Sequence, residues 1–237
     1  MCLLVLAWKT DPSLPLLLSG NRDERHARPS AALDWWSDRD WVGGRDLVAG
    51  GTWLAASRDG RFAVVTNFPR IGPPPAARSR GHLVPDYLDS GLSPLDFLNG
   101  IARDRHHYAG FTLVTGDSDS IAYFSNADET PRALQAGFHG LGNDGLDVAS
   151  PRLKHARARV EALLALQGPD SGALFALWGE KPRDGTNVAP FIAGDTYGTR
   201  CTTILRRTSN MLCIEELSYQ ADGRAGAPRA FRWSPAR

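Results

Sequence analysis

The chain has 237 residues, and its 27 basic side chains nearly balance its 26 acidic ones, which leaves a formal net charge of +1. This balance gives no electrostatic reason for nucleic acid or an anionic membrane to be a partner. The length fits one large domain with a substantial core, so we expect a single domain over residues 1–237. Three irregularly spaced cysteines are too few for a disulfide framework or a four-ligand zinc site, and they predict a reducing compartment, by default the cytosol.

The first 25 residues give the clearest prediction of local structure. Two apolar runs, residues 2–8 and 14–20, flank a polar loop that contains Asp11-Pro12, a pattern typical of a β-hairpin. A turn centred near Asp11 predicts antiparallel pairing with Cys2 opposite Gly20, beside the Asn-Arg-Asp-Glu run of residues 21–24 (the tetrad). The first run is too short for a signal peptide or a membrane span.

Cys2 can become the first residue of the mature chain, because methionine aminopeptidase removes Met1 when a small residue follows. An N-terminal cysteine carries a nucleophilic thiol and, a few bonds away, an α-amine whose reference pKa of about 7.7–8.0 lets it act as a base. One residue would then supply both the attacking atom and the proton acceptor. The alternative is that Cys2 is a small buried hydrophobe in a core strand.

Residues 28–41 are rich in Trp, Asp and Arg, and we interpret them as a long loop whose tryptophans brace it against the core. A hairpin is predicted over residues 52–67, and Pro69 ends its second strand at Asn67. The Asn67 amide could donate to a developing oxyanion, although a turn-forming Asn fits equally well. The glycines of residues 43–51 lack the order of a dinucleotide-binding loop.

The rest of the chain alternates helices and hairpins. An extended, lid-like loop is predicted at residues 71–77, a third hairpin at 111–125, and a closing β region from residue 197 onward. Helices are predicted to begin at the caps Ser93, Ser150 and Ser171.

Two further polar residues stand out in this second half. Glycines flank the segment that holds Asn143 and would let backbone approach a ligand, although a plain turn needs the same residues. Arg200 begins an otherwise β-rich run, so it is either a surface charge or a site cation.

Seven motifs, in chain order, resemble the NRDE family, which is named for the tetrad. They are Met1-Cys2, the tetrad, residues 46–54, Thr66-Asn67, Ser79-Arg80-Gly81, Leu141-Gly142-Asn143 and Tyr197-Gly198-Thr199-Arg200. Golgi organisation, lipid handling and haem mobilisation have been proposed as roles in this family. The resemblance also implies an α+β fold of the N-terminal-nucleophile hydrolase type, a four-layer αββα sandwich of two mainly antiparallel sheets. The count of hairpins and covering helices fits that architecture.

The resemblance implies roles for individual residues. Penicillin V acylases and bile-salt hydrolases, which share that fold, imply Cys2 as nucleophile, Asn67 and Asn143 as oxyanion-hole amides, and Arg200 as a late site arginine. Trp53 belongs to one of the shared motifs and is a candidate substrate contact.

The sequence departs from those hydrolases beside the nucleophile, where they carry Arg-x-x-Asp. An alignment on Gly20 puts Asn21 and Glu24 at these two positions. Arg22 or Arg25 could replace the missing cation if the chain presents it inward, and Glu24 could hold the α-amine through a charge-assisted hydrogen bond.

Two classes of function follow. The first is an amidohydrolase or acyltransferase that acts on a small amide or thioester and needs no cofactor. The second is a non-catalytic protein that holds haem or an acyl chain against its tryptophans, since fold does not imply activity. The enzyme hypothesis assigns roles to nine residues. The catalytic residues are Cys2, Glu24, Asn67, Asn143 and Arg200, and the substrate-binding residues are Asn21, Arg22, Asp23 and Trp53. The sequence does not specify the substrate or the oligomeric state.

Overall fold

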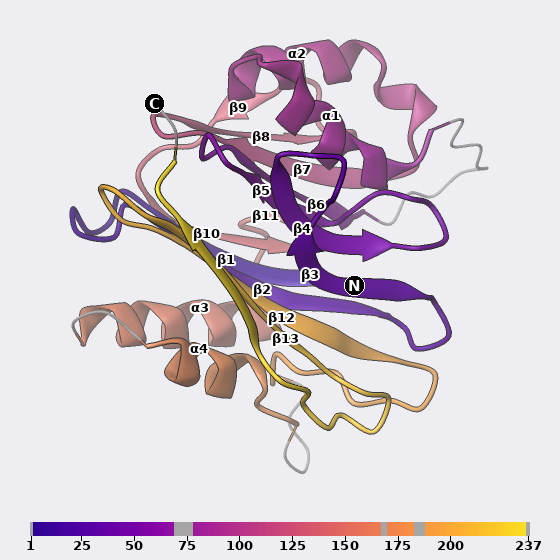
Figure 1. The fold of residues 1–237 in the computed structure, drawn as a ribbon, viewed down its shortest axis with the longest axis vertical. Helices are drawn as coiled ribbons and strands as arrows, with labels where there is room; N and C mark the ends of the chain where they lie inside the picture. The colour runs from indigo at the N-terminus through magenta and orange to yellow at the C-terminus, as the bar shows by residue number, and fades with distance from the viewer. Residues whose placement is uncertain (1, 69–77, 167–169, 183–187, 236–237) are drawn as a thin grey trace. The chain divides into compact units, whose positions relative to one another are not determined.

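The computed structural model describes residues 2–68, 78–166, 170–182 and 188–235. The chain divides into two compact units, each built on one seven-stranded sheet (Figure 1). The first unit comprises residues 1–28, 136–142 and 146–234, and the second comprises residues 29–135, 143–145 and 235–237. Two antiparallel sheets with helices were predicted, and this part of the fold class is confirmed. The single domain over residues 1–237 stays a prediction.

The first sheet has the strand order β11-β10-β1-β2-β12-β13-β14. Helices α3 and α4 cover one of its faces (Figure 1). The elements are β1 (Cys2–Trp8), β2 (Leu16–Arg25), β10 (Gly137–Gly142), β11 (Gly145–Leu146), α3 (Pro151–Ala165), α4 (Ser171–Trp178), β12 (Tyr197–Arg207), β13 (Leu212–Ser218) and β14 (Arg229–Trp233).

The second sheet has the strand order β3-β4-β5-β6-β7-β8-β9, with α1 and α2 packed on it. Its elements are β3 (Ser30–Trp35), β4 (Trp41–Asp46), β5 (Leu54–Ser57), β6 (Phe62–Asn67), the 3-10 helix η1 (Arg80–His82), α1 (Leu83–Ser90), α2 (Pro94–Arg103), the 3-10 helix η2 (Arg105–His107), β7 (Phe111–Gly116), β8 (Ile121–Ser125) and β9 (Arg132–Ala133).

The predicted hairpin of β1 and β2 is present, but its predicted register was wrong by two residues. Trp8 pairs with Leu16, so the loop is centred on Pro12 and Cys2 lies opposite Arg22, whereas Gly20 lies opposite Leu4. Asp11 shapes this loop by accepting hydrogen bonds from the backbone N–H and the hydroxyl of Ser13, both at 2.8 Å. Because side chains alternate with a period of two, a shift of two residues leaves every side chain on its predicted face.

The core of the first unit lies between its sheet and its two helices. Odd-numbered residues of β1, such as Leu3 and Val5, pack with Leu153 and Val160 of α3 and with Trp178 of α4. The even-numbered residues, Cys2 among them, therefore project from the opposite face of the sheet.

The helix starts agree closely with the predictions. Ser150 caps α3, its hydroxyl accepting from the N–H of Leu153 at 3.2 Å, and Ser93 caps α2. Helix α4 is capped one residue before the predicted Ser171, by Asp170, which accepts from the N–H of Ala173 at 2.6 Å.

The long loop predicted over residues 28–41 was wrong, since β3 occupies Ser30–Trp35 and β4 begins at Trp41. The predicted packing of tryptophans against the core is found for Trp41 and Trp36. Trp41 is buried in the core of the second unit, and its ring centroid lies 4.1 Å from that of Trp36. Two strands form here because paired backbone and the contact between the two indoles compensate for a sequence rich in charges.

The lid-like loop predicted at residues 71–77 lies outside the described residues. Among the helices that the structure describes, none has the length and apolar character needed to cross a membrane.

Candidate functional site

Cys2 begins β1 and lies in a row of paired residues that crosses three strands. It pairs with Arg22 on β2, and Arg22 pairs with Cys201 on β12. Directly paired residues project from the same face of a sheet, so these three side chains share the face opposite α3 and α4. Cys2 is partly exposed, whereas Arg22 and Cys201 are buried.

The environment of the Cys2 thiol opposes ionisation. Burial raises its pKa, and the positive charge at the amino terminus acts in the other direction. The Asp23 carboxylate raises the pKa further, while the Arg22 guanidinium and a hydrogen bond from the backbone N–H of Asp23 lower it. Attack by this sulfur at neutral pH would therefore need a base that removes its proton.

The alternation of β2 divides the tetrad between the two faces of the sheet. Arg22 and Glu24 lie on the face of Cys2, and Asn21 and Asp23 lie on the face covered by the helices. Glu24 is partly exposed, and its Oε1 accepts from the backbone N–H of Arg25 at 2.8 Å. Arg22 projects from the same face as Cys2, as a cation that replaces the missing arginine beside the nucleophile would have to do.

Asn21 uses its amide to hold distant backbone in place. Its Nδ2 donates to the carbonyl oxygens of Trp178 at 2.9 Å and Pro190 at 3.1 Å, and its Oδ1 accepts from the Thr202 hydroxyl at 2.6 Å. The residue is only 1% exposed. These bonds give Asn21 a structural task in the first unit.

Asn21→Ala is therefore expected to destabilise the protein by about 2–3 kcal/mol, because buried polar partners would lose their hydrogen bonds. Chemical denaturation followed by circular dichroism measures this change. The matched control is Asn210→Ala, in an exposed turn, for which we expect a change below about 0.5 kcal/mol. Equal free energies of unfolding for the two variants would refute the structural role of Asn21.

Asp23 is the most deeply buried acid of the tetrad, and its side chain has no exposed surface. The Thr199 hydroxyl donates to its Oδ1 at 2.7 Å, and Nη2 of Arg152 lies 3.7 Å from its Oδ2. Burial raises the pKa of Asp23 to about 6, although the hydrogen bond from Thr199 and the charge of Arg152 both lower it. The Asp23 carboxyl can therefore change charge near neutral pH.

Arg200 occupies the bulge where the pairing of β12 with β2 shifts between Thr199 and Cys201. Its Nη1 donates to the carbonyl oxygens of Arg25, His26 and Arg28 at 3.1, 3.0 and 3.3 Å. The guanidinium therefore fixes the chain that leaves β2.

The other predicted site residues belong to the second unit. Asn67 is the exposed last residue of β6 and pairs with Phe111. Trp53 packs over Gly44, where an added Cβ would lie 2.2 Å from the indole. Asn143 lies in the turn between β10 and β11. The roles of these three residues beside Cys2 stay predictions from the sequence.

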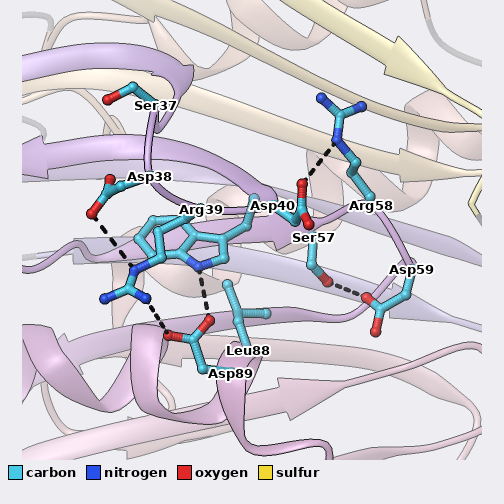
Figure 2. Close-up of a pocket in the computed structure, with 10 residues that line it drawn as sticks. Ser37, Asp38, Arg39, Asp40, Ser57, Arg58, Asp59, Leu88 and Asp89 are labelled. Atoms are coloured by element: carbon cyan, nitrogen blue, oxygen red, sulfur yellow. Dashed lines mark hydrogen bonds and ion pairs between the residues drawn. The ribbon is translucent and has the colours of Figure 1, made fainter.

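The second unit also contains an open cavity of about 810 Å³ (Figure 2). Its charged side chains pair with one another, Arg58 with Asp40 at 3.4 Å and Arg39 with Asp89 at 3.7 Å, and Asp89 accepts from Nε1 of Trp41 at 3.4 Å. None of the predicted catalytic residues lines it. Within the described ranges, no group of His, Cys, Asp and Glu is arranged to hold a metal ion.

A family model described as Transport and Golgi organisation 2 matches residues 1–220. The chain belongs to this family. The membership confirms the NRDE resemblance that the tetrad and six other motifs predicted. The Transport and Golgi organisation 2 homologue of Mus musculus is 33% identical over 169 residues, and the human homologue is 34% identical over 164.

These matches cover 65% and 62% of the chain, and the chain spans about 60% of the length of the mouse and human relatives. The Drosophila melanogaster family member is 28% identical over 72% of the chain and 68% of its own length. Among solved structures, an N-acylethanolamine-hydrolyzing acid amidase orthologue from Caenorhabditis elegans is similar, with a TM-score of 0.41 and 9% identity over 86% of this chain and 92% of its own.

Sequence reasoning missed Arg152 as a functional candidate, although it contacts Asp23 from α3. The sequence of α3 does not reveal this contact, because helical periodicity reports burial and not the partner of a charge. Thr199 lay within a family motif, and only the pairing of β12 with β2 reveals that its hydroxyl reaches Asp23.

Proposed function

We propose that this family member is an N-terminal-cysteine amidohydrolase or acyltransferase that acts on a small amide or thioester. The observation that supports it is the row formed by Cys2 and Arg22, with a nucleophile and a buried cation side by side at the start of β1. Removal of Met1 would give Cys2 a free α-amine next to its thiol. The three groups needed for acyl transfer, namely nucleophile, base and charge stabiliser, would then lie on two paired residues.

The proposed reaction begins when the Cys2 sulfur attacks the substrate carbonyl carbon and its proton passes to the α-amine. The carbonyl oxygen becomes an oxyanion, and the Arg22 guanidinium stabilises this charge. Collapse of the tetrahedral intermediate breaks the bond to the leaving amine or thiol, which takes the proton from the ammonium. Water or another acceptor then attacks the resulting Cys2 thioester, releasing the acyl group and restoring the thiol.

The raised pKa of the Cys2 thiol supports a mechanism in which the thiol is the nucleophile and the α-amine is the base. A thiol with a raised pKa stays protonated at neutral pH, so it does not react indiscriminately with solvent electrophiles. The α-amine, with a reference pKa of about 7.7–8.0, is close enough to neutrality to accept the proton when a substrate is present.

A panel of electrophilic acyl probes followed by peptide mapping tests the proposal. We expect acylation at Cys2, with little at Cys201 or Cys213, because the pKa of all three thiols is raised and only Cys2 would have an adjacent amine to take its proton. Intact-mass spectrometry of the same sample should show loss of Met1 in the acylated fraction. Acylation that is equal in Met1-retaining protein would eliminate the α-amine as the base.

A further inference from the structure

The face of the first sheet that carries Cys2 also carries a carboxylate, which belongs to Glu216 of β13. Arg22 pairs with Cys201 on β12. Two residues further along that strand, Thr203 pairs with Glu216. Because directly paired residues share a face, and residues two apart on one strand do so as well, Glu216 projects from the same face as Cys2 and Arg22. Glu216 is only 2% exposed, so its carboxylate is buried.

Polar groups of the same face contact this carboxylate. The Thr203 hydroxyl donates to Oε2 of Glu216 and the Ser218 hydroxyl donates to Oε1, each at 3.4 Å. The Cys201 thiol forms a further hydrogen bond with the carboxylate. These donors are neutral, and buried carboxylates in proteins are usually paired with a cation as well. The arginines on this face are therefore the next groups to consider.

Arginines lie on both sides of Glu216 along the sheet. Arg229 of β14 pairs with it directly and is exposed. Arg22 of β2 lies on the other side, beyond Cys201, and is buried. Burial raises the pKa of the Cys2 and Cys201 thiols, and the Arg22 charge lowers both. The Glu216 charge raises the pKa of Cys201 further, so the buried cation and the buried carboxylate both act on Cys201.

A carboxylate and a guanidinium that are buried on one face stabilise each other. Neighbouring strands lie about 4.8 Å apart, so β2 and β13, with β12 between them, are roughly 10 Å apart. Arginine and glutamate have long side chains, and the thiol of Cys201 between them is small. The Arg22 and Glu216 charges therefore attract each other where burial weakens screening by water. Each charge lowers the cost of burying the other.

We propose that Glu216 is a positioning residue of the Cys2 site, which holds the Arg22 guanidinium in the row between Cys2 and Cys201. Glu216 acts through Arg22 and not on the substrate. The inference rests on the proposed function only in taking Arg22 as the cation that serves Cys2. Loss of the Glu216 charge would leave the buried guanidinium without this counter-charge, and the guanidinium would turn towards solvent and away from Cys2.

The pH profile of Cys2 alkylation by iodoacetamide, quantified by peptide mapping of the full chain, tests this role. In Glu216→Gln we expect the profile to move to higher pH, because Cys2 loses part of the positive charge that lowers its pKa. Alkylation at pH 7 should slow by about 2- to 10-fold, where tenfold corresponds to one pKa unit. A direct effect of removing a negative charge has the opposite sign, since it would speed up alkylation.

Glu215 provides the matched control, because it is the next residue of the same strand and is also buried. It projects from the opposite face, where it contacts Arg206 and accepts from the Ser171 hydroxyl at 2.6 Å. Glu215→Gln should lower the stability of the fold but leave the Cys2 profile unchanged. Arg229→Gln should also leave this profile unchanged, because Arg229 faces Glu216 from the side away from Cys2.

A double variant shows whether Glu216 acts through Arg22. In Arg22→Gln/Glu216→Gln the profile should coincide with that of Arg22→Gln alone, because a positioning residue has no effect once the group that it positions is removed. Glu216→Asp keeps the charge but withdraws it by one methylene. Its profile should therefore lie between those of the wild-type protein and Glu216→Gln.

A Glu216→Gln profile that matched wild type, or that moved to lower pH, would overturn the inference. Equal shifts in Glu216→Gln and Arg229→Gln, or additive shifts in the double variant, would do so as well. Should Glu216→Gln fail to fold, a Glu216→Asp profile identical to wild type would have the same consequence. Alkylation needs no turnover, so the role of Glu216 stands or falls separately from the proposed acyl transfer.

Discussion

Replacement of Cys2 by Ala should reduce hydrolysis of a small acyl thioester by about 10³-fold or more, since removing the nucleophile of a covalent mechanism removes its chemical step. Alanine is also small, so Met1 should still be removed and the α-amine should remain. The variant therefore tests the thiol alone. The released thiol of the substrate can be followed by absorbance, with circular dichroism as the check on folding.

The matched controls are the other two cysteines. Cys201→Ala changes a neighbour of Arg22 on the face of Cys2, and Cys213→Ala changes a residue of β13. Both should keep activity within about threefold of wild type, because neither residue has a part in the proposed reaction. If Cys2→Ala hydrolysed the thioester as fast as these controls, the hydrolase proposal would fail, and the alternative of a haem or acyl-chain carrier would take its place.

Much of the hairpin that carries Cys2 could be predicted, because its information is local. Alternation with a period of two determines which side chains share a face. The predicted faces are therefore correct although the predicted register is wrong by two residues. The error arose because the turn was centred on Asp11, whereas the loop occupies residues 9–15 and Asp11 bonds forward to Ser13. Loop length, and not turn composition alone, determines register.

The surroundings of Asn21 and Asp23 could not be predicted in the same way. Asn21 binds Trp178 and Pro190, whereas Asp23 contacts Arg152 and Thr199. All four partners lie more than a hundred residues away along the chain. No periodicity of a single strand encodes such contacts, which arise only when α3 and β12 are assembled on the sheet. The family motif marked these residues, and the structure supplies a physical reason for each.

The two faces of β2 therefore have different chemistry. One face carries the Asn21 amide, which binds the Pro190 carbonyl, and the Asp23 carboxyl, which binds Thr199, and the other face carries Arg22 beside Cys2. Successive residues of a strand point to opposite faces, so the four consecutive residues of the tetrad place two side chains on each face of the sheet. A substitution at Asn21 or Asp23 should act first on the stability of the fold, whereas one at Arg22 should act first on the Cys2 thiol.

Arg22→Gln is expected to lower thioester hydrolysis by about 10²- to 10³-fold, the size of effect seen when a donor to a developing oxyanion is removed. It should also move the pH profile of Cys2 alkylation by iodoacetamide to higher pH, because the Arg22 charge lowers the pKa of that thiol. Arg22→Lys keeps the charge and should recover part of both losses. Arg25→Gln, an exposed change on the same strand, should leave rate and profile unaltered. If Arg22→Gln behaved like Arg25→Gln in both assays, the buried guanidinium would have no part in the chemistry of Cys2.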